Sequence, residues 1–156
     1  MAHARQQIRE QIATLLKVLP VSYKAVFETR IPPSRAVMPF LLVFASDESS
    51  TQMLIHPTGM YDRSVSINVV GALKMPGTGN GTSNTQTVED LMDAMSVEIE
   101  TKLKASVVTK AKTIALQSTS MEVIISEADG TVSHAELTQT WVCTYDTVEG
   151  LPEVLA

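Results

Sequence analysis

The segment SHAELTQTWVCTYDT, residues 133–147, shows the cleanest two-residue periodicity in the chain. Its apolar residues share one parity and alternate with polar ones: Ala135, Leu137, Trp141, Cys143 and Tyr145 against His134, Glu136, Thr138 and Thr140. Successive side chains of a strand point to opposite faces of the sheet, so this pattern predicts one long strand that is buried on one face. The preceding segment, residues 112–126, reads as a second long strand, and the Asp129-Gly130 turn signal joins the two as a hairpin.

Residues 40–73 supply the rest of the predicted sheet. FLLVFAS at 40–46 is a continuous apolar run, which is typical of a central strand buried on both faces. We interpret the whole stretch as a three-stranded meander in which DESSTQ, at 47–52, is a turn. A shorter strand is predicted at 24–29.

Two helices are predicted from apolar residues at helical spacing. The first carries Ile8, Ile12, Leu15, Leu16 and Leu19 and ends at Pro20. The second carries Val88, Leu91, Met92, Met95, Ile99 and Leu103. The order of the elements predicts a single α+β domain over residues 1–156, with two helices packed on one face of a largely antiparallel sheet.

A glycine-rich segment, MPGTGNGTSNTQTVEDLMDAM, leads into the second helix and carries Gly77, Gly79 and Gly81. It resembles a phosphate loop, but it has no lysine before the helix and the first helical turn is rich in carboxylates, which would repel phosphate. We therefore expect residues 75–86 to form a mobile connection or a loop that takes part in assembly, and we expect no nucleotide cofactor.

The composition argues against an enzyme. The net charge is −5 and the 12 lysines and arginines are scattered, so nothing resembles a basic nucleic-acid-binding stripe. The three histidines lie in separate segments without partners at metal-ligand spacing, which predicts no metal site. Carboxylates such as Asp47, Glu48 and Asp146 are assigned to turns or to the C-terminal region, and no nucleophile motif is present. The single cysteine, Cys143, fits a reducing cytoplasm, and no apolar run is long enough for a membrane span.

A proline-rich arm precedes the apolar run at 40–46 and carries Arg30 and Arg35 around Pro32 and Pro33. Prolines donate no ladder hydrogen bonds, so the arm should run along a surface or a sheet edge. We expect its two guanidinium groups to bind carboxylates on an adjacent subunit.

Three segments, taken in order, resemble the tail terminator proteins of long-tailed bacteriophages, often named minor tail protein U: HARQQIREQIATLL, ETRIPPSRAVMPFLLVFASDES and WVCTYDTVEGLPE. The resemblance spans nearly the whole chain, although the middle diverges. Where that family usually has an arginine after the tyrosine of the last strand, this chain has Asp146, so we expect an assembly contact at that position to differ.

The resemblance implies a structural virion protein without catalysis or cofactor. Members of the family form a hexameric ring on the head-proximal end of the tail tube, where the ring stops polymerisation and offers a surface for head joining. The implied partners are other copies of the chain, the tube protein and the head–tail connector proteins, with DNA passing through the ring without sequence-specific binding. The implied place of assembly is the host cytoplasm. Two alternatives stay open: another neck or tail-completion subunit, and a small-molecule enzyme that uses the glycine-rich loop.

Overall fold

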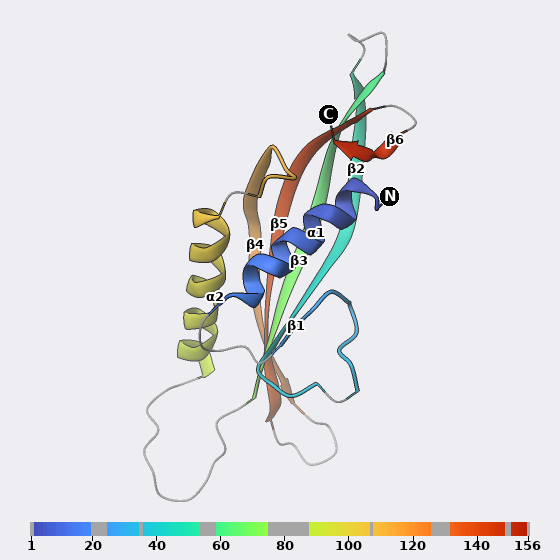
Figure 1. Cartoon of the computed structure of the whole chain (residues 1–156). Coiled ribbons are helices and arrows are strands. Elements are labelled where there is room, and N and C mark those ends of the chain that lie inside the picture. The colour runs from blue at the N-terminus through green and yellow to red at the C-terminus, as the bar shows by residue number, and fades with distance from the viewer. Residues whose placement is uncertain are drawn as a thin grey trace, which may run out of the picture.

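The structure is a computed structural model, and it describes residues 2–19, 25–34, 36–53, 59–74, 88–106, 108–125, 132–148 and 151–155. Its elements are α1 (Ala4–Lys17), β1 (Ala25–Phe27), β2 (Phe40–Met53), β3 (Met60–Lys74), α2 (Val88–Ala105), β4 (Thr113–Ile125), β5 (Val132–Val148) and β6 (Leu151–Leu155). The strands form one mixed sheet in the order β1-β2-β3-β5-β4, with β6 paired to β5. Only the β1–β2 pair is parallel. Both helices lie on the same face of the sheet (Figure 1), which confirms the predicted α+β class.

The main core fills the space between the helices and the sheet. Each helix presents a buried stripe: Ala4, Ile8, Ile12, Ala13 and Leu16 on α1, and Met92, Met95, Ile99 and Leu103 on α2. The sheet contributes residues of one parity from β3 and β5: Val65, Ile67, Val69, Leu137, Trp141, Cys143 and Tyr145. The periodicity of residues 133–147 therefore predicted the buried face of β5 correctly.

A smaller cluster lies on the other face of the sheet, near β1. Phe40 and Leu42 are buried there, and Ala36 and Met38 of the proline-rich arm pack against them. Leu41 and Val43 point into the main core instead. The first part of β2 is thus buried on both faces, as its continuous apolar run predicted.

The predicted three-stranded meander is wrong. Residues 40–74 form two long antiparallel strands, because the DESSTQ segment continues β2 instead of turning. The register shifts between Ala45 and Glu48, where Ser46 and Asp47 lie opposite Ser66. This β-bulge absorbs one extra residue and reverses the parity of the strand, so that Glu48 shares a face with the core residue Val65. Residues 54–58, which follow β2, lie outside the described residues.

A second bulge interrupts β4 between Leu116 and Ser118. Before it, Ile114 and Leu116 share the helix-covered face with Cys143 and Trp141; after it, Thr119, Met121 and Val123 take that face. The parity change explains why the apolar residues of this strand switch from even to odd positions. The expected Asp129-Gly130 turn lies outside the described residues.

In the described part of the chain, the two lateral edges of the sheet are largely unpaired with other strands. At one edge, β1 pairs only with Phe40–Leu42, so the outer side of β2 has no neighbouring strand from Val43 onwards. At the other edge, β4 pairs with β5 alone, and residues 117–123 are all exposed. The face away from the helices carries hydroxyl side chains from three strands, among them Ser64, Ser66, Ser118, Ser120, Thr138 and Thr140.

Candidate functional site

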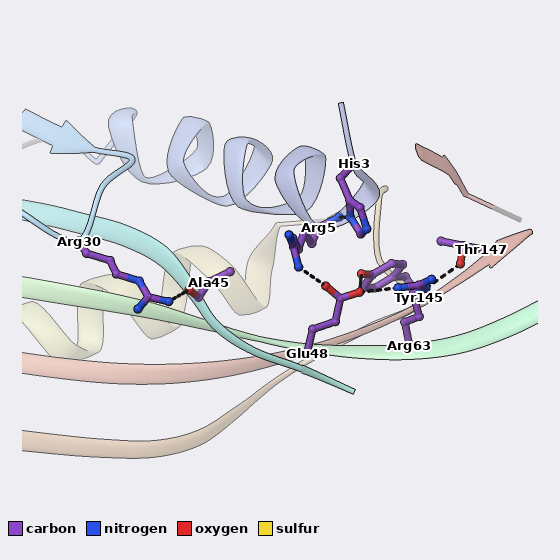
Figure 2. A network of polar contacts seen from close by, with 8 residues as sticks. All are labelled: His3, Arg5, Arg30, Ala45, Glu48, Arg63, Tyr145 and Thr147. Atoms are coloured by element: carbon purple, nitrogen blue, oxygen red, sulfur yellow. Dashed lines mark hydrogen bonds and ion pairs between the residues drawn. The ribbon is translucent and has the colours of Figure 1, made fainter. Parts of the chain in front are cut away.

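A polar network centred on Glu48 lies beneath the N-terminal half of α1 (Figure 2). Glu48 Oε1 accepts hydrogen bonds from Arg63 Nη1 at 2.7 Å and from the Tyr145 hydroxyl at 2.9 Å. Its Oε2 accepts a hydrogen bond from Arg5 Nη1 at 2.8 Å. Arg63 also donates from Nε to Thr147 Oγ1 at 2.8 Å. One carboxylate therefore joins α1, β2, β3 and β5.

The network holds Glu48 as an anion. Burial alone raises the pKa of this carboxyl, but hydrogen bonds from its three donors outweigh burial, so the pKa lies below its ordinary value. Burial and the hydrogen bond to Glu48 raise the pKa of the Tyr145 hydroxyl. An ionised carboxylate with both oxygens engaged, beside a phenol that stays protonated, is suited to fixing elements together and poorly suited to proton transfer.

A groove of about 350 Å³ opens next to this network, along the free edge of β2. We call it the arginine groove, because Arg5, Arg9 and Arg30 line it together with the β2 residues from Phe44 to Glu48. Arg9 Nε is buried and has no hydrogen-bond partner among the described residues. Such a buried, unsatisfied donor is costly.

Arg30 lies in the arginine groove at the point where β1 leaves β2. Its Nη2 donates to the backbone oxygen of Ala45 at 2.7 Å, and its guanidinium lies 5.3 Å from the centre of the Phe44 ring. The side chain thus covers the first open stretch of the β2 edge while remaining exposed. The expected contact of Arg30 with a neighbouring subunit stays a prediction.

Among the described residues that the sequence marked for assembly, Asp146 does not line the arginine groove with Arg30. Asp146 was assigned to a turn or the C-terminal region, but it lies within β5, is only 7% exposed and forms an ion pair with Lys112. Asp47 and Glu48 belong to the bulge of β2, so their assignment to a turn is also wrong. Arg35, Gly77, Gly79 and Gly81 lie outside the described residues.

Sequence reasoning missed Arg5, Arg9 and Arg63. Arg5 and Arg9 gave one signal, since they stand four residues apart on one helix and so share a face. The sequence contains no such signal for Arg63, because its partner, Glu48, faces the same side of the sheet only as a result of the β2 bulge.

The remaining candidates have structural roles. Cys143 is buried, as the periodicity of residues 133–147 predicts, and burial raises the pKa of its thiol to about 12. His3 caps α1 by accepting the backbone N–H of Arg5, and His134 contacts Glu136 at 3.1 Å. His56 lies outside the described residues. Within the described ranges, no group of three or more metal-ligating side chains occurs, and neither helix is long and apolar enough to cross a membrane.

Comparison with known proteins adds no relative. The sequence matches no family model, and no curated protein is significantly similar to it.

Proposed function

We propose that the chain is the subunit of a structural ring that caps the head-proximal end of a phage tail tube. In this role the ring stops tube growth and presents a surface for head joining. The resemblance of three segments to tail terminator proteins supplies the partners: further copies of the chain, the tube protein and the head–tail connector proteins.

The observation that carries the proposal is the presence of two different open edges on opposite sides of one sheet. The outer side of β2 beyond Leu42 and the whole of β4 lack neighbouring strands in the described part of the chain. A subunit with two unlike lateral surfaces makes head-to-tail contacts, and such contacts close into rings when the rotation between copies permits. An isolated domain usually protects strands of this length, so open edges favour a protein that works in an assembly.

The face away from the helices suits the wall of a DNA conduit. It carries serine and threonine side chains on β3, β4 and β5, together with carboxylates such as Glu122 and Glu136. Neutral hydroxyls and carboxylates do not neutralise phosphates, so a lumen lined by this face would let DNA pass without holding it.

The proposal is tested by two measurements on the purified chain. Native mass spectrometry should show a closed oligomer, with six copies expected. Electron micrographs of the protein mixed with isolated tail tubes should then show the ring at one end of each tube. Binding to the neck of tail-less heads in place of tube ends would favour the other connector role. A monomer that binds neither tubes nor heads would overturn both.

A further inference from the structure

We propose that the arginine groove binds carboxylates from the first two turns of α2 in a second copy of the chain. The inference rests on the proposed ring and names one of its contacts: Glu89 and Asp93 of one subunit against Arg9 and Arg30 of the next. Its three supports are the charge of the groove, the placement of the arginines on α1 and the positions of the two surfaces on the sheet.

The groove is positive in a negatively charged chain. Five cations line it or pair with its carboxylates: Arg5, Arg9, Arg30, Lys17 and Arg63. Three carboxylates oppose them: Glu28, Asp47 and Glu48. Glu48 is held by Arg5 and Arg63, and Glu28 by Lys17, which leaves Arg9 and Arg30 opposite Asp47. The groove therefore has room for further negative charge, although the whole chain carries a net −5.

The positions of Arg5 and Arg9 lower the stability of α1 in the isolated subunit. Arg5 and Arg9 are four residues apart, and like charges at this spacing destabilise a helix by about 0.2–0.5 kcal/mol. Both lie in the N-terminal half of α1, whose first turn has no acidic residue, so Arg5 opposes the positive end of the helix dipole. Glu48 compensates Arg5, but no described residue accepts a hydrogen bond from Arg9 Nε. An incoming carboxylate would compensate the positive charge of this guanidinium.

The acidic turns of α2 carry the matching charge. Glu89 and Asp93 are exposed and four residues apart, so they lie on one face of α2. Guanidinium groups bind carboxylates by charge-assisted hydrogen bonds, and these are stronger than neutral ones.

The two surfaces lie on opposite sides of the subunit, as a head-to-tail contact requires. The groove borders β1 and β2, whereas α2 packs over β5 and β4 at the other end of the strand order (Figure 1). The bulges in β2 and β4 also interrupt the edges, which disfavours a continuous sheet running from copy to copy. Side chains beside the edges, more than an extended ladder, should therefore determine which surfaces meet.

A charge reversal and its rescue test the contact. Arg9→Glu should weaken self-association by about tenfold or more, measured by sedimentation and native mass spectrometry. The reversal of Glu89 and Asp93 to lysine should do the same. Both residues are exposed, but lysines there oppose the positive end of the α2 dipole, so the stability of this variant is measured as well. A chain that carries Arg9→Glu, Arg30→Glu, Glu89→Lys and Asp93→Lys should regain association, because both sides of the contact have then exchanged their charges.

One exposed site provides a matched control: Lys110→Glu changes a charge outside the groove lining and outside α2, and should leave association unchanged. Thermal unfolding of each variant separates misfolding from a lost contact. Unchanged association in Arg9→Glu and in the lysine variant overturns the groove contact while the ring stands. A wild-type chain that stays monomeric also overturns the groove contact. So does an Arg9→Glu variant that self-associates normally but no longer binds a DNA duplex, because the arginine would then serve DNA and not a second subunit. A rescued assembly that never caps tubes keeps the contact and refutes the proposed function.

Discussion

At the scale of single residues, Glu48 determines how α1 is fixed to the sheet. Its carboxylate accepts hydrogen bonds from a helix residue, Arg5, and from two strand residues, Arg63 and Tyr145. The Glu48 side chain is 13% exposed and that of Arg63 is 19% exposed, so this pair is shielded from solvent far better than the Arg5 side of the network. The loss of Glu48 would leave a poorly hydrated guanidinium without its anion.

We expect Glu48→Gln to lower the free energy of unfolding by about 1–3 kcal/mol near neutral pH, as measured by urea denaturation. The pKa of Glu48 is lowered in the folded state, so its stabilising effect is fully present above the unfolded value of 4.5. The effect is lost as pH falls through the folded-state pKa, and the gap between wild type and variant should narrow in acid. Asp47→Asn, in the same bulge but exposed, is the control and should change stability by less than about 0.5 kcal/mol. A gap that stays constant with pH would contradict this role.

The sequence did not predict the Glu48 network, and the reason is local. Polar residues after an apolar run resemble a turn. A β-bulge reverses which residues face the core, so the alternation of apolar and polar residues does not continue through it.

The role of Gln139 was not predictable for a different reason. It occupies a core position of β5, is 0% exposed, and bonds to Ser96 and Trp141. Ser96 is distant in sequence, so only the packing of α2 on β5 reveals how this amide is satisfied.

At the scale of elements, the spacing of apolar residues predicted β5 and both helices well, because each of these elements buries a single apolar face in the main core. The spacing of apolar residues did not predict how closely α2 approaches the sheet. It depends on Gly71 of β3, where an added Cβ would overlap Met95 Sδ and would lie 3.3 Å from Leu41 Cδ2. The missing side chain at this position makes room for a methionine of the helix.

Gly71→Ala should therefore destabilise the protein by about 1–3 kcal/mol through overpacking. The methionine is flexible and part of the strain can be relieved, so the value should lie toward the lower end of that range. Met95→Ala alone should also destabilise the protein, by removing buried apolar volume. In the double variant the new methyl group would enter the vacated space, and urea denaturation should show a loss smaller than the sum of the two single losses. Strictly additive losses would show that the two positions do not compete for space.

At the scale of the whole molecule, the fold separates three surfaces. The helices cover one face of the sheet, hydroxyl side chains occupy much of the other, and the two lateral edges remain open in the described part of the chain. The sequence predicted that two helices would cover one face of a sheet, because the spacing of apolar residues marks which faces are buried. It did not predict which strands would lie at the edges of the sheet, because strand order depends on pairings between segments far apart in the chain, such as β3 with β5.

The last prediction concerns the length of tail tubes. A tube grows by adding like rings through a contact that does not close, so it has no intrinsic stop. A ring that matches the tube on one side only would supply that stop. We therefore expect a phage without this gene to make tubes longer than normal and heads without tails, both measurable in negatively stained lysates. Purified protein added before overgrowth should restore normal tails, whereas the same protein added afterwards should cap tubes that are already too long. The Arg9→Glu chain should fail in both additions, and the Lys110→Glu chain should succeed. If tubes of normal length that already carry a terminal ring accumulate in the mutant, the chain acts later, at the joint between head and tail.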